Sequence, residues 1–515
     1  MDDNSFPCNV SVRPSPGKGK GLFASGMLAA GDILLFIPRP LITVLDIPRL
    51  DDTCANCFER SSEQLGLYVK ACVGCNKIKY CGKKCQSQSW KRVHKYECKI
   101  FKRDDIPPLP HAVRAALQLA MHMENHVLSA VEKENVAQMA TFRTSKSDLY
   151  DVQIVLSAVR DIAARCGTPR LDDRQAEIYV GQILRNSLAL TADTLETLGI
   201  AIDPMVCSAN HSCDPNATVV FNGASILLRA LKPIVKDAEV CISYVDTSRP
   251  YSIRQETLFE SYAFKCQCEK CILGPTQKED NFIQPATRLA ERWTTIPGLS
   301  TLATNSPLHS AYYVGDSKDK ILLGQAQGFL FEKLRLAQSE HDRKTAIRIL
   351  TEIMETCSRS GVWPVYRQPY PDARHGLAWN LQQVGDLPSA LGHMITMYLY
   401  INPVLYPQET HPIRVVQIWH LMRMCSKLYA ERDSPWVSTM HAQGFDFVVI
   451  IWRLLKEMDM LLEKSHGRFT SLWQGVQALM LSMQEEIIGT SEDNLLLIEQ
   501  DPHDCWGMFK SLAAP

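Results

Sequence analysis

The chain has 515 residues, of which 46% are hydrophobic and 22% charged, and its formal net charge is −1. These values are typical of globular proteins with two to four domains, and they exclude a protein that is basic throughout, as many nucleic-acid-binding proteins are. The N-terminus is acidic without an apolar run, and the apolar stretch at 445–455 is broken by Asp446 and Arg453. We therefore expect a soluble intracellular protein that does not bind membranes.

A glycine-rich segment lies between two β-type runs near the N-terminus. The runs at 10–12 and 22–24 flank Gly17–Gly21, and residues 33–37 form a further short apolar run. This pattern predicts strands around a hairpin-like loop. Alternate glycines let a backbone approach a ligand closely. The segment lacks the spacing of a Walker motif, so a flexible hairpin tip is the alternative interpretation.

Residues 54–98 contain four pairs of potential metal ligands. The pairs are Cys54 and Cys57, Cys72 and Cys75, Cys81 and Cys85, and His94 and Cys98. Pairs separated by two or three residues can place both donors on one ion, and eight ligands are enough for two tetrahedral zinc sites. With every position filled by protein, these ions are expected to be structural and to supply folding energy. A disulfide framework would need an oxidising compartment, which the sequence does not indicate.

The same segment is strongly basic. Residues 54–103 carry twelve Lys or Arg against three Glu. Such a patch suits an acidic partner or nucleic acid, although lysines of this kind also simply keep a surface solvated.

Helical spacing of apolar residues follows the basic segment. It predicts helices at 112–123, 152–165 and 174–187. We interpret His111, His122 and His126 as surface or capping residues.

Residues 210–216 read Asn-His-Ser-Cys-Asp-Pro-Asn, between an apolar run and a β-type run. The composition fits an ordinary turn as well as a functional loop. Strands are expected at 217–221 and 225–229, and Asn222-Gly223 between them favours a type I′ hairpin.

A strand at 239–244 and a helix at 254–262 lead to three further cysteines, Cys266, Cys268 and Cys271. Three thiols need a fourth ligand to complete a tetrahedral zinc site. Since none lies nearby in sequence, Cys213 is the natural candidate.

Residues 275–515 show helical periodicity throughout. We predict helices at 322–336, 348–357, 373–384, 388–400, 415–429 and 445–462. No clean 34-residue period of a tetratricopeptide repeat emerges. The region is either a stabilising bundle or a peptide-binding wall.

Four motifs occur in a fixed order: Gly17–Leu22, Asn210–Asn216, Ile242–Tyr244, and Cys266 with Cys268 and Cys271. In this order they resemble the motifs of SET methyltransferases. The eight-ligand segment between the first two resembles the MYND zinc finger. Such an insertion is the hallmark of the SET and MYND domain lysine methyltransferases, and the resemblance spans residues 8–271.

The resemblance implies an α+β fold in which a zinc finger splits a β-rich SET domain. Its parts would be the N-terminal SET part (1–50), the finger (51–102), a helical insert region (103–205), the SET core (206–260), a post-SET zinc segment (261–274) and an all-helical, tetratricopeptide-like C-terminal domain (275–515).

The resemblance also implies a cofactor site for S-adenosylmethionine. Tyr244 would be the catalytic residue, in contact with the cofactor, and Tyr262 would line the channel for the target lysine. A further acidic or amide contact is expected from residues 141–148 without an assigned position. The other cofactor-binding residues would be Lys18, Gly19, Lys20, Asn186, Asn210, His211 and Phe264, the last stacked on the adenine.

Three structural zinc ions follow from the same resemblance. The finger pairs would interleave, and the post-SET cysteines would take Cys213 as their fourth ligand. The three implied ligand sets are Cys54, Cys57, Cys81 and Cys85; Cys72, Cys75, His94 and Cys98; and Cys213, Cys266, Cys268 and Cys271.

The function implied is that of a monomeric, S-adenosylmethionine-dependent protein-lysine N-methyltransferase of cytoplasm and nucleus. Histone and non-histone substrates both stay open. The alternative is a catalytically weak scaffold whose finger and helical domain bind proline-rich or acidic proteins. Nucleic acid is a weaker candidate partner.

Overall fold

The computed structural model describes residues 8–61, 67–125, 127–141, 149–274, 317–359, 363, 365–431, 433–488, 492–501 and 503–514. The chain divides into two compact units. The first unit comprises Met1–Val245, Gln255–Cys268 and Phe469–Leu472, and the second comprises Asp246–Arg254, Glu269–Arg468 and Trp473–Pro515. Within the described ranges, every helix is too short or too polar to cross a bilayer.

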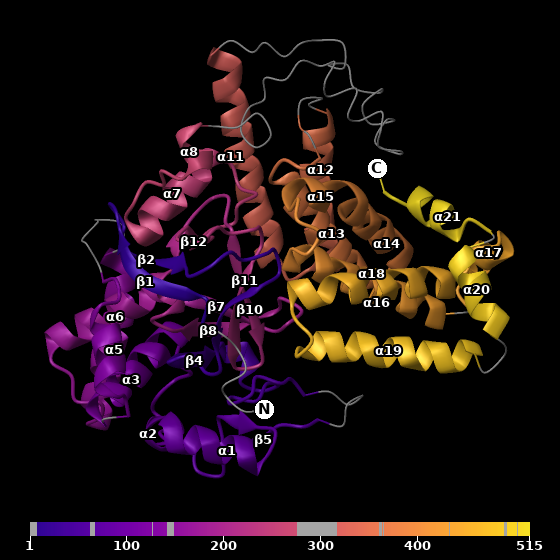
Figure 1. Ribbon diagram of the computed structural model, residues 1–515. Helices are drawn as coiled ribbons and strands as arrows, with labels where there is room; N and C mark the ends of the chain where they lie inside the picture. The colour runs from indigo at the N-terminus through magenta and orange to yellow at the C-terminus, as the bar shows by residue number, and fades with distance from the viewer. Residues whose placement is uncertain are drawn as a thin grey trace. The chain divides into compact units, whose positions relative to one another are not determined.

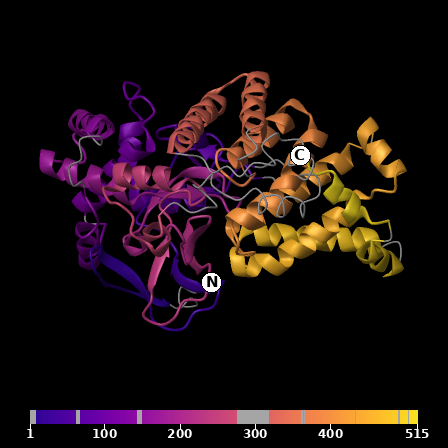
Figure 2. The ribbon, with the colours of Figure 1, turned by 90° about the horizontal axis from the view of Figure 1, so that it is seen from above.

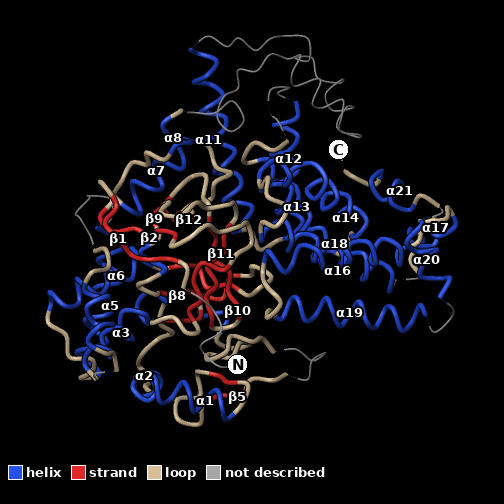
Figure 3. The backbone as a smooth tube through the Cα atoms, in the orientation of Figure 1, coloured by secondary structure: helices blue, strands red, loops and turns tan. Residues whose placement is uncertain are grey.

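The strands of the first unit form three small sheets besides the short ribbon of the finger (Figure 3). All three contribute to one apolar core, in which Leu22, Leu34 and Ile226 are fully buried. In sheet order, the strands are β1 (Val10–Ser15), β2 (Gly19–Ala24), β12 (Glu239–Ile242) and β9 (Asn210–His211); β10 (Ala217–Asn222), β11 (Ser225–Ala230) and β3 (Ile33–Ile37); and β4 (Ile42–Leu45), β8 (Thr197–Ile202) and β7 (Leu188–Thr191).

The first sheet brings distant motifs together. β1 and β2 pair antiparallel from Ser15↔Gly19, which confirms the hairpin around the glycine-rich loop. Gly17 and Gly19 have φ values of +73° and +83°, which a residue with a Cβ adopts only at a cost. β12 pairs with β2 on one side and runs parallel to β9 on the other. The glycine-rich loop and Asn210-His211 therefore belong to two strands that flank β12.

The β10–β11 hairpin differs in detail from the prediction. Asn222 pairs with Ser225, so the two loop residues are Gly223 and Ala224. Of these only Gly223 has a positive φ, +53°, whereas a type I′ turn needs positive φ at both loop residues, so the predicted turn is wrong in both position and type. Asn222 stays in the strand, where its side chain donates to Phe469 O at 2.9 Å. A Cβ on Gly223 would lie 2.7 Å from the Cys57 carbonyl oxygen, so the hairpin tip contacts the finger.

The helices predicted before residue 187 are all present. They are α3 (His111–Glu124), α5 (Leu149–Cys166) and α6 (Asp173–Asn186), with the additional short α4 (Ala130–Ala137). With β4 and β8 they enclose a second apolar core.

The interpretation of the three histidines is partly wrong. His122 is only 2% exposed, because its position in α3 belongs to the buried helix face that the alanines define. His111 is half-buried and its Nδ1 lies 2.6 Å from Asp46 Oδ1. His126 lies outside the described residues.

The finger lies at one edge of the first unit (Figure 1). Its strands β5 (Lys70–Ala71) and β6 (Lys79–Tyr80) pair antiparallel. A continuous helical stretch follows: α1 (Lys83–Ser89), a π-helical turn at Trp90–His94, and α2 (Lys95–Phe101). A π-turn rotates the side chains that follow it, and here it contains the ligand His94.

The second unit is helical, as predicted. Helices α11 to α14 pack each against the next, and α16 packs against α18 (Figures 1 and 2). Its six predicted helices are confirmed. The π-helical turn Met397–Ile401 continues α14, and α17, α19, α20 and α21 were not predicted. The elements are α7 (Tyr251–Tyr262, whose residues both units share), α8 (Glu269–Ile272), α11 (Ser317–Ser339), α12 (Arg343–Arg359), α13 (Tyr370–Val384), α14 (Leu387–Thr396), α15 (Asn402–Leu405), α16 (Pro412–Ala430), α17 (Pro435–Ala442), α18 (Phe447–Ser465), α19 (Ser471–Ile488), α20 (Glu492–Gln500) and α21 (Cys505–Ser511).

Candidate active site and metal centres

Four aromatic side chains from three segments meet in the first unit. The ring centroids of Tyr244 and Tyr262 are 4.8 Å apart, and those of His211 and Tyr244 are 5.4 Å apart. Phe264 lies 6.1 Å from His211 and 6.5 Å from both tyrosines. β9 supplies His211, the segment after β12 supplies Tyr244, and the last residue of α7 and the segment after it supply Tyr262 and Phe264. All four were candidate site residues, and the fold brings them together.

His211 connects this aromatic group to a cysteine cluster. Its Nδ1 accepts a hydrogen bond from the Tyr244 backbone N–H at 3.0 Å, and its Nε2 lies 3.1 Å from Cys213 Sγ. Since Nδ1 is an acceptor, the proton of the neutral ring belongs on Nε2 and points to the sulfur. Both ring nitrogens thus face protein atoms. Any contact of His211 with a cofactor would therefore be made by its main chain or by the face of its ring.

Tyr244 is held by both its backbone and its hydroxyl. The hydroxyl donates to Ala209 O at 2.7 Å. Burial raises the pKa of Tyr244 well above the ordinary value, and burial also raises the pKa of Tyr262. Both side chains are therefore neutral phenols at physiological pH, suited to hydrogen bonding and ring contact rather than to proton abstraction.

Glu239 joins the glycine-rich loop to Asn210, and sequence reasoning missed it. Its carboxylate accepts from Ser15 Oγ at 2.8 Å, Lys18 Nζ at 2.9 Å and Asn210 Nδ2 at 2.7 Å. Burial opposes its ionisation, but these hydrogen bonds outweigh burial and hold the pKa of Glu239 below its usual value. A Cβ on Gly21 would lie 2.6 Å from Glu239 Oε1, so a larger residue there would displace this carboxylate. A single Glu at the start of a predicted strand gives no signal of this role.

Asn210 and Lys20 form the next part of the same surface. Asn210 Nδ2 also donates to Lys20 O at 2.8 Å, and Lys20 Nζ donates to Gln138 Oε1. Gln138 lies just before the segment from which an amide contact was expected, and residues 142–148 of that segment lie outside the described residues.

Asn186, at the end of α6, lies near this segment and near a buried thiol. Its Nδ2 donates to Ala140 O at 2.9 Å and to Gln182 O at 2.7 Å. The Cys207 thiol donates to Asn186 O at 3.2 Å. Burial raises the pKa of Cys207 to about 12, which keeps it a thiol. Cys207 was not singled out from the sequence, where it lies in an apolar run.

The twelve predicted metal ligands gather into three clusters with the predicted grouping. The ligand atoms of each cluster lie within 4.8 Å of one another. We call these the first cluster (Cys54, Cys57, Cys81, Cys85), the second cluster (Cys72, Cys75, His94, Cys98) and the third cluster (Cys213, Cys266, Cys268, Cys271). The interleaving of the finger pairs and the recruitment of Cys213 are thereby confirmed.

The spacing within the clusters fits zinc. A tetrahedral ion with Zn–S bonds of about 2.3 Å places its ligands about 3.8 Å apart. The Sγ atoms of Cys57 and Cys81 are 3.6 Å apart, and those of Cys81 and Cys85 are 3.5 Å apart. Cys75 Sγ lies 3.7 Å from His94 Nε2. Thiolates and a single imidazole are the donors that structural zinc takes.

The imidazole ligand has a carboxylate behind it. His94 Nδ1 lies 3.8 Å from Glu97 Oε2, while Gln118 Nε2 donates to Glu97 Oε1 at 2.7 Å. A carboxylate on the far side of a ligating histidine orients the ring and raises its basicity. Glu97 is buried, so this arrangement belongs to the interior of the first unit.

The comparisons with known proteins agree with this geometry. The SET domain family matches residues 19–245. The chain is 31% identical to SET domain and MYND-type zinc finger protein 6 of Schizosaccharomyces pombe, over 51% of the chain and 52% of that protein. It is 29% identical to histone-lysine N-methyltransferase ASHR1 of Arabidopsis thaliana (51% and 55% covered) and 31% identical to N-lysine methyltransferase SMYD2 of Homo sapiens (51% and 60% covered). The matched regions thus span little more than half the length of these relatives.

Proposed function

The chain contains a SET domain and is similar to proteins of the SET and MYND domain family, and on this premise we propose that it is an S-adenosylmethionine-dependent protein-lysine N-methyltransferase. The observation that carries the proposal is the aromatic group of His211, Tyr244, Tyr262 and Phe264 beside the glycine-rich loop. These residues come from separate motifs, and their close approach in the fold supports the proposal.

The surroundings of Tyr244 and Tyr262 suit a lysine that must lose its proton. A lysine ammonium has a pKa near 10.4 in water and is not nucleophilic until it is neutral. Partly buried aromatic rings disfavour the ammonium and lower that pKa. Since both phenols stay protonated, they supply hydrogen bonds that orient the amine, and water carries the proton away.

The residues around the glycine-rich loop fit the cofactor. Nothing lies within 4 Å of the points where Gly17 and Gly19 would carry a Cβ, so this side of the loop has room for a ligand. Asn210 adjoins the loop through its hydrogen bond to Lys20 O, and Phe264 is only partly buried. S-adenosylmethionine, when bound, supplies the activated methyl group.

Positioning accounts for much of the rate that these residues would provide. Holding two reactants in line converts a bimolecular encounter into an intramolecular one. The Tyr244 hydroxyl donates to Ala209 O, and its backbone N–H donates to His211 Nδ1, so the residue is held at its side chain and at its backbone. The three zinc clusters hold loops in place and leave no open coordination position for a reacting water.

Isothermal titration calorimetry of the zinc-replete chain with S-adenosylmethionine tests the proposal. We expect one binding event per chain, together with transfer of labelled methyl groups to lysine-containing peptides. Absence of cofactor binding would favour the alternative of a catalytically weak scaffold. Binding of the cofactor without transfer to any lysine would contradict the substrate class alone.

The substrate would be a protein. One relative is named a histone-lysine methyltransferase and another an N-lysine methyltransferase, so both histone and non-histone lysines are within the proposal. We extend it to acidic or proline-rich partners for the basic finger and to a monomer of cytoplasm and nucleus. A peptide array with labelled cofactor, followed by localisation of a tagged chain, addresses these points.

A further inference from the structure

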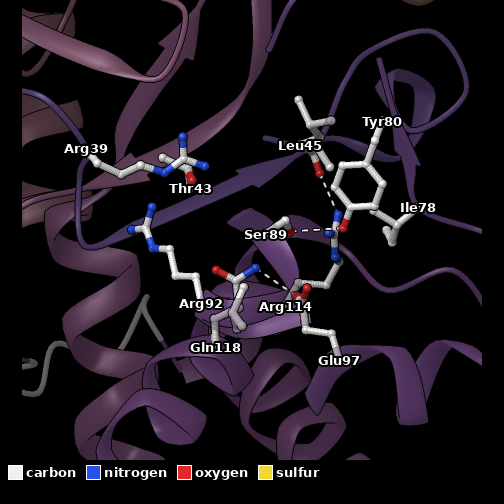
Figure 4. A pocket seen from close by; sticks show the side chains of 12 residues that line it. Arg39, Thr43, Leu45, Ile78, Tyr80, Ser89, Arg92, Glu97, Arg114 and Gln118 are labelled. Carbon is white, nitrogen blue, oxygen red and sulfur yellow. Dashed lines mark hydrogen bonds between the residues drawn. The ribbon is translucent and has the colours of Figure 1, made fainter. Parts of the chain in front are cut away.

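A cavity of about 20 Å³ lies in the first unit between the finger, β4 and α3 (Figure 4). Its lining includes Arg92 and Glu97 from the finger, Thr43 from β4, and Arg114 from α3, together with Arg39 from the segment before β4. A space of this volume holds a water molecule or one monatomic ion. It is too small for phosphate or for an organic acid.

The lining is richer in cations than in anions. Three guanidinium groups face the cavity with one carboxylate, Glu97. That carboxylate is already engaged, because one oxygen accepts from Gln118 and the other lies 3.8 Å from His94 Nδ1. Glu97 also interacts with the charge of Arg114, so one carboxylate stands against three guanidinium groups and positive charge remains in excess.

Arg39 and Arg92 are anchored by uncharged acceptors alone. Arg39 donates to Asn56 O at 2.8 Å and to Asn56 Oδ1 at 2.7 Å. Arg92 Nη2 donates to Pro40 O and to Leu41 O, the latter at 2.8 Å. Among the ion pairs of the described residues, neither arginine has a carboxylate partner.

Two donors at this site are buried without any hydrogen-bond partner. They are Arg92 Nη1 and Arg114 Nε, and Arg114 as a whole is only 4% exposed. A buried donor without a partner costs free energy, and the cost is larger when the group is charged. In native proteins such donors are normally satisfied by an ordered water or an ion.

The positive charges of Arg39 and Arg92 repel each other. The charge of Arg39 acts against that of Arg92, whereas Glu132 and Asp203 act in the opposite direction. A negative charge in the cavity would relieve the repulsion and satisfy the open donors together.

We propose that this cavity is a binding site for one monatomic anion, chloride in the cell, held by Arg92 together with Arg39, Arg114 and the Thr43 hydroxyl. The ion fastens the finger to β4 and α3, because its ligands come from all of these elements. This site contains none of the residues of the aromatic group. Its occupancy therefore acts on the stability of the first unit.

Diffraction from crystals grown in sodium bromide tests the site directly. We expect an anomalous bromine peak in the cavity, within about 3.5 Å of Arg92 Nη1. A cavity that holds only a water molecule, with no anomalous peak, would overturn the proposal. The experiment uses the unmodified chain, so it does not depend on the folding of a variant.

Thermal unfolding in sodium chloride and in sodium gluconate of equal ionic strength provides the test in solution. Chloride should raise the unfolding midpoint by about 2–4 °C relative to the bulky gluconate ion. Thr43→Asp places a fixed carboxylate in the cavity and should abolish the difference, whereas Thr197→Asp, which adds the same charge at an exposed position outside the cavity lining, should retain it. A bromide peak without a chloride effect in the unmodified chain would mark binding at crystal concentration only, and would also overturn the proposal.

Discussion

The second cluster is fully buried within the finger, whereas the third cluster has one partly exposed ligand and adjoins the aromatic group. Glu97 stands behind His94 in the second cluster. In the third, the ring of His211 lies between Cys213 and the backbone of Tyr244. The two clusters have similar ligands, but the second cluster stabilises the finger, whereas the third cluster supports the aromatic group. Metal loss should therefore have different consequences at each.

The largest effect should come from a change that leaves all three clusters intact. Tyr244→Phe removes the hydroxyl that donates to Ala209 O and should lower methyl transfer by about 100-fold or more, because the amine loses its orientation. Cofactor affinity should be nearly unchanged, since the backbone contact with His211 stays. Labelled-methyl assays and calorimetry measure the two quantities.

The control for this change is Tyr68→Phe, because Tyr68 is 58% exposed and belongs neither to the aromatic group nor to the three clusters. It should leave both quantities unchanged. Full activity of Tyr244→Phe on a verified substrate would remove Tyr244 from the catalytic role.

The next effect should come from the third cluster. Cys213→Ser removes a ligand and the sulfur that faces His211 Nε2. Zinc content should fall from three ions to two, and cofactor affinity should weaken about 10- to 100-fold as His211 loses its support. Metal analysis and calorimetry on the same sample check the linkage. Cys8→Ser, at an exposed cysteine outside the clusters, should change neither.

A smaller effect on the site is expected from the second cluster. Cys98→Ser should also release one zinc ion and unfold the finger, since metal binding supplies its folding energy. Cofactor affinity should stay within about twofold of the unmodified chain, because changes at separate sites act independently. A loss of affinity as large as that of Cys213→Ser would erase the distinction between the clusters.

The smallest effect should come from His122, which belongs to neither cluster. Burial, and then the charge of Arg92, lower its pKa from 6.5 to about 4. Between these values the unfolded chain binds more protons than the folded chain, so stability falls as the pH falls through this window. His122→Met should reduce that loss by about 3 kcal/mol at its acid end.

Chemical denaturation of both chains across this pH range measures the slope. His503→Met, at an exposed histidine, should leave the slope unchanged. An unchanged slope in His122→Met would show that the histidine is not neutral in the folded chain.

The comparison also shows what the sequence could predict. Metal donors are recognisable one by one, so the spacing of the ligands was enough to predict the pairs. The grouping of the pairs into clusters followed from the family resemblance. Glu239 and Gln138 were missed because their roles depend on strands and helices that meet only in the fold. His122 was misplaced because a polar residue on a buried helix face does not reveal its surroundings. The turn at Asn222 moved by one residue because a contact with Phe469 keeps Asn222 in the strand.

The segment Phe469–Leu472 bears on how the chain can be dissected. It belongs to the first unit although 200 residues lie between it and Cys268. Phe469 O accepts from Asn222, Ser471 Oγ donates to Glu59 at 3.2 Å, and Leu472 N donates to Asp193. Burial raises the pKa of both carboxyl groups, and these hydrogen bonds partly offset it. A shortened chain that stops after the post-SET cysteines would leave both acids without these donors, so the first unit is best expressed together with the helices that follow it in sequence.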